Sequence, residues 1–247
     1  MNNSFPVGDR SFDQAHPLVI AEIGTSHGGN LSRALELIDA AAEAGAGCAK
    51  FQCVFADEIV HPNTGSVPLP GGPVRIYDRF KALELDESFY ATVKEKVEAR
   101  GMLFLCTPFG LRSARLLRKL GVKAMKVASP ELNHLPLIDE LASYALPTLV
   151  SSGVSTLADI ERSLNRLACP VLLLHCVTAY PAPAEDYNLR LLHGLQAVFG
   201  RPTGVSDHSL DPVLVPSLAI ACGAMAVEKH ICLSRNDPGL DDPIALP

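Results

Sequence analysis

Short apolar segments alternate along this chain with longer amphipathic segments. The apolar segments are nearly continuous in hydrophobic residues, which is typical of strands buried on both faces of a parallel sheet. We therefore predict eight strands. They span residues 18–23, 48–52, 102–106, 124–128, 148–152, 171–175, 203–206 and 226–230.

The segments between these strands carry apolar residues at helical spacing. Asn30 and Asp86 are expected to cap the N-termini of two helices. Asp211 is expected to cap another, with Pro212 at its first helical position. The predicted helices span about 31–44, 87–100, 111–119, 135–144, 156–167, 187–199 and 211–222.

Strands that alternate with helices favour a single (β/α)₈ barrel of parallel strands, the TIM-barrel fold, over an open sheet. We assign the barrel to residues 17–247 and a polar N-terminal extension to residues 1–16. The last helix of the barrel is expected to be missing, because this sequence stops at Pro247. Residues 54–80 contain four prolines and three glycines and predict a long loop over the C-terminal end of the strands.

Composition narrows the classes of function. The chain has 247 residues, of which 48% are hydrophobic and 19% charged, and this apolar share suits a packed core. The net charge of −6, with no long basic run, argues against a nucleic-acid partner. No apolar stretch reaches the roughly 18–20 residues that span a bilayer, so no membrane is expected. The seven cysteines form no CxxC pair and the N-terminus lacks a secretory signal, which favours a cytoplasmic location.

Polar side chains end every predicted strand, at the edge where the active site of a barrel lies. Lys50 and Lys126 are the most informative, because each lies in an apolar segment and a lysine is rarely buried without a partner. We expect the two lysines to form a pocket for a small anion that carries phosphate or carboxylate. The alternative is that they form structural ion pairs with Glu22 and Glu131. The hydroxyl groups expected in the same pocket belong to Thr107, Ser129, Ser151 and Ser206.

Two histidines, His208 and His230, end the seventh and eighth predicted strands. Adjacent strands lie about 5 Å apart, so the two imidazoles could bind one divalent metal, with Glu22 one strand further round. Imidazole with carboxylate and water suits Mn²⁺, Fe²⁺, Co²⁺ or Zn²⁺ better than Mg²⁺. The alternative is that each histidine only makes hydrogen bonds at the rim of the barrel.

The ordered motifs of this chain resemble those of the sialic acid (N-acetylneuraminate) synthase family from about residue 17 to the end. Any one of these motifs alone is weak, but their order and their place at strand ends make the set specific. The motifs are Ala21-Glu22-Ile23-Gly24, Lys50-Phe51-Gln52, Thr107-Pro108-Phe109, Lys126-Val127-Ala128-Ser129 with Glu131, Ser151-Ser152-Gly153, His175-Cys176 with Tyr180-Pro181, Ser206-Asp207-His208, Glu228-Lys229-His230 and Pro238-Gly239-Leu240-Asp241.

The resemblance implies an enzyme that condenses phosphoenolpyruvate with the aldehyde of an N-acetylated amino sugar, such as N-acetylmannosamine. The products would be a nine-carbon sialic-type acid and phosphate. It also implies a divalent metal on His208 and His230, with Mn²⁺ expected and Mg²⁺ or Co²⁺ as alternatives. Phosphoenolpyruvate would be held by Lys50, Thr107, Lys126, Ser129, Ser151 and Ser206. The metal and the sugar would be surrounded by Glu22, Gln52, Glu131, Tyr180 and Asp241, and Glu131 would stabilise a cation at C2 or activate water.

Departures from the family pattern cluster where the sugar should bind, so the motifs do not identify the sugar substrate. They are Ser26-His27-Gly28-Gly29 in place of an Asn-His-Asn-Gly run, and Gly110, Thr178 and Asp242. The family's C-terminal antifreeze-like domain is absent from this sequence, so we expect a homodimer or a partner chain that supplies the missing part. Two other functions stay open: a relative that binds ligand without turnover, and a synthase of deoxy-heptulosonate or deoxy-octulosonate type. The latter would need extra arginines, and the candidates are Arg75, Arg79 and Arg235.

Overall fold

The computed structural model describes residues 4–69, 72–237 and 239–247, and its main feature is a barrel of eight parallel strands. The strands are hydrogen-bonded in the order β7-β4-β3-β12-β11-β10-β9-β8, and β7 and β8 lie side by side where the barrel closes. All eight predicted strands and the (β/α)₈ fold are confirmed. The strands are β3 (Leu18–Gly24), β4 (Cys48–Cys53), β7 (Leu103–Pro108), β8 (Met125–Val127), β9 (Thr148–Ser151), β10 (Val171–Cys176), β11 (Thr203–Asp207) and β12 (Ala226–His230).

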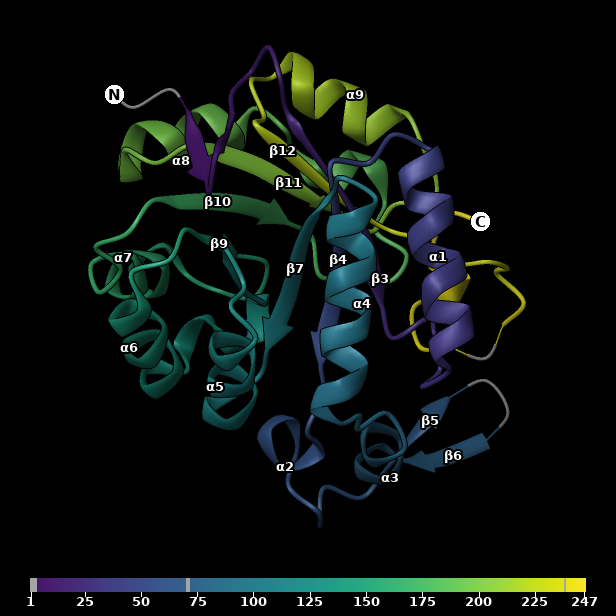
Figure 1. Cartoon of the computed structure of the whole chain (residues 1–247). Coiled ribbons are helices and arrows are strands. Elements are labelled where there is room, and N and C mark those ends of the chain that lie inside the picture. The colour runs from purple at the N-terminus through teal and green to yellow at the C-terminus, as the bar shows by residue number, and fades with distance from the viewer. Residues whose placement is uncertain (1–3, 70–71, 238) are drawn as a thin grey trace.

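Helices surround the barrel on its outer side (Figure 1). The predicted caps are present, since the Asn30 side chain accepts the N–H of Arg33 and the Asp86 side chain accepts the N–H of Phe89. After β12, the described chain contains the 3₁₀-helix η3 (Asp242–Ile244) and no α-helix. The surrounding helices are α1 (Leu31–Glu43), α4 (Glu87–Ala99), α5 (Leu111–Lys119), α6 (Leu135–Tyr144), α7 (Leu157–Leu164), α8 (Leu191–Phe199) and α9 (Leu214–Ala221).

Two predicted helix starts were wrong. The Asp211 carboxylate accepts the N–H groups of Val213 and Leu214 at 2.8 Å each, so α9 begins at Leu214 and Pro212 precedes it. The helix predicted from residue 187 begins at Leu191. Asn188 has φ 39°, in the left-handed region, and this residue separates α8 from the preceding 3₁₀-helix η2 (Ala184–Tyr187).

The segment 54–80 lies at the C-terminal end of the barrel, as predicted. Figure 1 shows its elements grouped at the end to which the arrowhead of β7 points. The prediction of a loop was incomplete, because the segment contains short elements of its own. They are α2 (Ala56–Ile59), the hairpin strands β5 (Ser66–Leu69) and β6 (Gly72–Arg75), and α3 (Ile76–Lys81), while residues 70–71 lie outside the described chain.

The opposite end of the barrel is closed by a hairpin that the sequence did not predict. Its strands are β1 (Phe5–Val7) and β2 (Arg10–Phe12). Phe5 and Val7 are buried in one cluster with Leu18 and Leu103, at the starts of β3 and β7. The N-terminal segment therefore contributes core side chains to the barrel.

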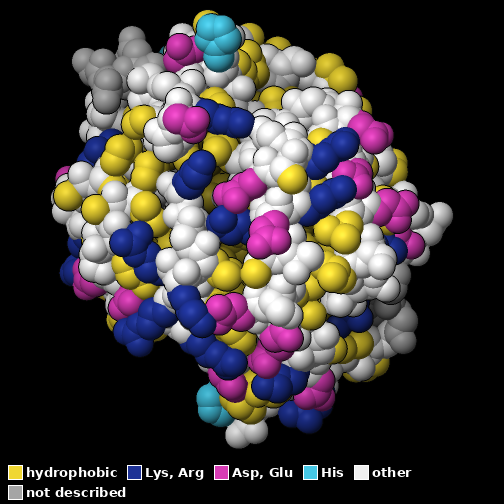
Figure 2. All heavy atoms as spheres, in the orientation of Figure 1, with side chains coloured by type: hydrophobic (Ala, Val, Ile, Leu, Met, Phe, Trp, Pro, Cys, Tyr) yellow, Lys and Arg dark blue, Asp and Glu magenta, His cyan; other side chains and the backbone are white. Residues whose placement is uncertain are grey.

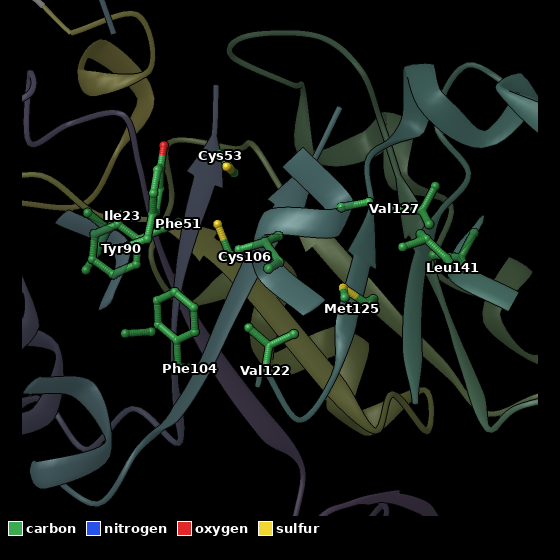
Figure 3. Close-up of a cluster of buried hydrophobic side chains, with 14 of the residues drawn as sticks. Ile23, Phe51, Cys53, Tyr90, Phe104, Cys106, Val122, Met125, Val127 and Leu141 are labelled. Carbon is green, nitrogen blue, oxygen red and sulfur yellow. The ribbon is translucent and has the colours of Figure 1, made fainter. Parts of the chain in front are cut away.

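Side chains that point outward from the strands form a second, larger core against the helices (Figure 3). Phe51 and Phe104 stack with ring centroids 5.9 Å apart, and Tyr90 of α4 belongs to the same cluster. This core fixes each strand against its helix and so fixes the direction of the inward side chains on the same strand.

Inward side chains change character along each strand. Residues two apart on a strand point to the same side. Ile20 is followed by Glu22, Leu105 by Thr107, and Leu174 by Cys176. The N-terminal half of the barrel interior is thus packed with apolar groups, and its C-terminal half is polar.

The outer surface mixes the two signs of charge. Figure 2 shows Lys and Arg side chains interspersed with Asp and Glu on the face in view. In the part of the chain that the structure describes, no helix has both the length and the apolar character to span a bilayer. All seven cysteines are free thiols, and six of them are buried, with Cys222 partly exposed.

A substitution at Gly204 tests how tightly the barrel interior is packed. A Cβ at Gly204 on β11 would lie 2.5 Å from the Ala226 carbonyl oxygen and 2.8 Å from Cδ2 of Leu174. We expect Gly204→Ala to lower the free energy of unfolding by about 1–3 kcal/mol, the usual cost of overpacking. Gly194→Ala in α8 is the control, since a Cβ there meets nothing within 4 Å. Urea unfolding that gives both variants the same midpoint would contradict this packing.

Candidate active site

A cavity of about 230 Å³, here the first cavity, lies at the C-terminal end of the barrel. All eight barrel strands contribute to its wall, and every predicted site residue except Glu131 lines it. The lining residues are Glu22, Thr25, Lys50, Gln52, Phe80, Thr107, Phe109, Lys126, Ala128, Ser129, Pro130, Ser151, Cys176, Thr178, Tyr180, Ser206, His208, Glu228, His230, Leu240 and Asp241.

Strand register brings the charged groups together. Glu22 on β3 is the register partner of His230 on β12 and of Lys50 on β4. Ser206 on β11 is the register partner of Glu228 on β12. Neighbouring strands lie about 4.8 Å apart, so inward side chains at matched positions converge over the centre of the barrel.

Lys50 is held by two carboxylates. Its Nζ lies 2.8 Å from Oε2 of Glu22 and 3.5 Å from Oε2 of Glu228. Burial lowers the pKa of Lys50, but the two carboxylates outweigh burial and hold that pKa above its ordinary value. Lys50 is therefore charged, and the ion pair with Glu22 that was the structural alternative is present.

Lys126 differs, because it forms no ion pair among the described residues. It is only 2% exposed, and its Nζ donates to Oγ of Ser151 at 2.7 Å and to the Val127 carbonyl oxygen at 3.0 Å. Burial lowers its pKa, with a smaller opposing effect from Glu228. The alternative ion pair with Glu131 is not formed, so a buried ammonium group faces the cavity without a carboxylate in contact.

Glu228 is the site residue to which sequence reasoning gave no role. Its Oε1 accepts from Oγ of Ser206 at 2.9 Å, and its Oε2 faces Lys50. Burial raises the pKa of Glu228, but Lys126 and Lys50 outweigh burial and lower it. The sequence could have predicted this position, because Glu228 and His230 are two residues apart on one strand and therefore point to the same side of it.

His208 is oriented as a metal ligand would be. Its Nδ1 lies 2.8 Å from the Val177 carbonyl oxygen, so Nδ1 carries the hydrogen and the lone pair is on Nε2. Nε2 lies 3.2 Å from the hydroxyl of Tyr180, whose ring stacks on the imidazole at 4.2 Å. Burial lowers the pKa of His208 to about 4, so the imidazole is neutral.

His230 completes the pair, with its ring centroid 5.5 Å from that of His208. Its Nδ1 is buried without a hydrogen bond and lies 3.7 Å from Oδ2 of Asp241. Within residues 4–69, 72–237 and 239–247, no three His, Cys, Asp or Glu side chains are gathered as in a complete protein metal site. Two imidazoles on adjacent strands nevertheless fit a borderline divalent cation that takes its other ligands from water and substrate.

Glu22 is engaged elsewhere and does not stand as a third ligand. Its Oε1 accepts from Nε2 of Gln52 at 2.9 Å, and its Oε2 pairs with Lys50. Gln52 and Glu22 thus form one wall of the first cavity together with Asp241.

Glu131 lies in the 3₁₀-helix η1 (Ser129–Asn133), directly after β8, and does not line the first cavity. Its Oε2 is buried without a hydrogen-bond partner. Burial raises the pKa of Glu131 to about 7, although Lys126 opposes this effect. The carboxyl group is thus near its midpoint of protonation at neutral pH. Pro238, part of a predicted motif, lies outside the described residues.

Comparison with known protein families matches residues 37–247 to the NeuB family. The N,N'-diacetyllegionaminic acid synthase of Legionella pneumophila is 36% identical over 236 residues, covering 90% of this chain and 66% of that protein. The N-acetylneuraminate-9-phosphate synthase of Homo sapiens is 30% identical over 240 residues, covering 94% of this chain and 66% of that protein. This chain therefore spans about two thirds of the length of these relatives.

Comparison with solved structures also identifies a sialic acid synthetase as similar to this chain. The N-acetylneuraminic acid (sialic acid) synthetase of Leptospira borgpetersenii, in complex with citrate, matches with a TM-score of 0.89 and 30% identity. The match covers 99% of this chain and 85% of that one. The resemblance seen in the sequence motifs is thereby confirmed. Because the family match spans most of the chain and these relatives are synthases of sialic-type acids, the chain belongs to the NeuB family.

Proposed function

We propose that this chain condenses phosphoenolpyruvate with the open-chain aldehyde of an N-acetylated amino sugar resembling N-acetylmannosamine, and that the reaction depends on a divalent metal. The products are a nine-carbon sialic-type acid and phosphate. The observation that carries the proposal is one cavity that joins two features from different strands of the same barrel. One is a buried lysine that forms no ion pair among the described residues, and the other is a pair of histidines with ring centroids 5.5 Å apart. The names of the relatives support the reaction type.

The anion is assigned to the side of the cavity formed by β8 and β9. Lys126 and Ser151 are already hydrogen-bonded to each other there. The Ser129 hydroxyl accepts the N–H of Gly153 at 3.0 Å, and it still has a hydrogen to donate. A phosphate or carboxylate group at this position would give Lys126 a contacting anion, which none of the described carboxylates provides.

The cation is assigned to His208 and His230, and we propose Mn²⁺, with Co²⁺ or Mg²⁺ as alternatives. The chemistry that a cation bound there supplies is Lewis-acid polarisation of the aldehyde oxygen. The Val177 carbonyl fixes the His208 tautomer, and Tyr180 covers one face of the ring. Both contacts hold the lone pair of His208 toward the cavity.

The remaining residues act on the reacting carbons. A bond forms between C3 of phosphoenolpyruvate and the aldehyde carbon, water adds to C2, and the C2–O bond breaks to release phosphate. Positive charge develops at C2, and the carboxylates of Glu22 and Glu228 are placed to stabilise it. Glu131, with a pKa of about 7, is suited to take the proton from the attacking water once its side chain turns toward the cavity.

Phosphate release is the direct test of the proposed reaction. We expect release from phosphoenolpyruvate only when Mn²⁺ and an N-acetylated amino sugar are both present. A panel that also contains erythrose 4-phosphate and arabinose 5-phosphate separates this reaction from deoxy-heptulosonate and deoxy-octulosonate synthesis. No release with any sugar, together with retained binding of phosphoenolpyruvate, would favour the relative that binds without turnover.

Lys126→Met tests the anion site. We expect it to weaken phosphoenolpyruvate binding by about 1.5–3 kcal/mol, the scale of a hydrogen bond to a charged group. The control is Lys123→Met, because Lys123 is exposed near the opposite end of the same strand. Lys126 is a sharper probe than Lys50, whose removal also leaves Glu22 and Glu228 without their partner. Calorimetry that gives Lys126→Met and Lys123→Met the same affinity would exclude this anion site.

His208→Ala and His230→Ala test the metal site. Each variant should lose bound divalent metal and turnover, because two imidazoles are the only protein ligands assigned. Both variants should keep the far-ultraviolet circular dichroism of the parent. His193→Ala is the matched control, since His193 is exposed on α8. Metal analysis that finds full occupancy in both active-site variants would disprove the assignment.

A further inference from the structure

A second cavity of about 390 Å³ lies beside the first one, and the two share Thr25 and Leu240 in their walls. The second cavity is bounded by the turn between β3 and α1, by Arg33 in the first turn of α1, by the end of α3, and by residues 239–242. Consecutive residues divide between the two spaces, since Asp241 lines the first cavity and Asp242 the second. The two cavities are therefore neighbours, with Thr25 and Leu240 in the wall of both.

Asp242, in the wall of the second cavity, has a carboxylate oxygen without a hydrogen-bond donor. The residue is only 1% exposed. Its Oδ2 accepts the N–H of Gly239 at 2.9 Å, but its Oδ1 is buried with no hydrogen-bond partner among the described residues. A buried carboxylate oxygen without a donor is costly, so a ligand group that carries N–H or O–H would be stabilised there.

The charges around the second cavity favour a neutral group over an anion. Arg33 is already engaged, because its Nε donates to the Ser26 carbonyl oxygen at 2.7 Å and its guanidinium pairs with Asp237. Burial lowers the pKa of His27 to about 4, against an opposing contact with the Gly24 carbonyl, so this imidazole adds no charge. Arg79 also lines the cavity, so the charged side chains of the wall include both signs. A phosphate near Oδ1 of Asp242 would meet a charge of its own sign.

Part of the wall is apolar. Ala82 and Leu83 follow α3, and Leu240 lies between the two cavities. An acylamino group has one N–H to donate and one methyl to bury, and this wall provides a surface for each.

We propose that the second cavity is a specificity subsite for a neutral, donor-bearing substituent of the amino sugar, with Oδ1 of Asp242 as its acceptor, and that Asp242 discriminates against sugar phosphates. The identity of the ligand as an amino sugar rests on the proposed function. The subsite itself rests on the geometry of Asp242.

Asp242→Asn tests the subsite, because the Gly239 N–H still requires an acceptor and so orients the amide. The oxygen of the amide takes the place of Oδ2, and its NH₂ group replaces the acceptor Oδ1 with a donor. The ligands are N-acetylmannosaminitol, an open-chain analogue without an aldehyde, and its 6-phosphate, each titrated by calorimetry with Mn²⁺ present. We expect the parent to prefer the neutral alditol and Asp242→Asn to bind it about tenfold or more weakly.

Two further variants and the affinity for phosphoenolpyruvate serve as controls for the Asp242→Asn measurement. Gly239→Ala should repeat the loss, because a Cβ there would lie 2.3 Å from Oδ2 of Asp242 and displace the carboxylate. Asp186→Asn removes one negative charge at an exposed position outside both cavities, and it should keep the affinity for the alditol. Phosphoenolpyruvate affinity should stay within about twofold in all variants, which also reports that each is folded.

The outcomes separate this inference from the proposed reaction. Unchanged alditol affinity in Asp242→Asn, or a parent protein that prefers the 6-phosphate, would overturn the subsite even if turnover is found. Alditol binding that depends on Asp242, in a protein that releases no phosphate, would support the subsite and leave the proposed reaction wrong.

Discussion

The organisation of this protein depends on placing charged groups inside a barrel whose other half is apolar. The barrel interior buries the side chains of Lys50, Glu22 and Glu228. Burying any one of these charges without a partner would cost free energy of folding. Their mutual ion pairs offset that cost for Lys50 and leave Lys126 with hydroxyl and carbonyl contacts only. The two lysines and the two glutamates together carry no net formal charge. The proposed anion at Lys126 would therefore add negative charge to a balanced site, and the proposed divalent cation at the two histidines would restore the balance. Anion and cation binding should reinforce each other for this electrostatic reason.

The apolar half of the barrel makes this arrangement rigid. Side chains at the starts of the strands pack with Phe5 and Val7 of the β1–β2 hairpin, which closes the N-terminal end. The outward side chains pack against the helices in a separate cluster. Each strand is thus fixed on both faces, and the polar residue two positions further along the strand has little freedom. A clash such as the one expected at Gly204 is therefore transmitted directly to the site.

Sequence reasoning succeeded for residues that lie within strands. The pleat fixes the direction of a strand side chain, so Lys50, Ser151 and His230 could be assigned to one cavity from their positions alone. It was less reliable where the chain leaves the strand, since Ser129, Tyr180, His208 and Asp241 line the cavity as predicted but Glu131 does not. Glu131 follows β8 by several residues, and the 3₁₀-helix η1 turns it away from the cavity wall. The β1–β2 hairpin was missed because two three-residue strands in a polar segment carry no periodic signal.

The family resemblance placed residues 26–29 and Asp242 near the sugar, but the sequence did not predict the second cavity, for a related cause. Its wall joins residues 25–33, 79–83 and 239–242, which come from three separate parts of the chain. None of these residues belongs to a barrel strand, whereas the anion and metal groups of the first cavity nearly all do or follow one directly. Loops can change without disturbing the core, so contacts with the sugar can diverge while the strand-borne chemistry is kept. This division explains how relatives named for N,N'-diacetyllegionaminic acid and for N-acetylneuraminate 9-phosphate can match one barrel at 36% and 30% identity. By the same reasoning, the proposed subsite assigns the choice of sugar to the residues around Asp242, whereas the lysines and histidines would act on any sugar of this class.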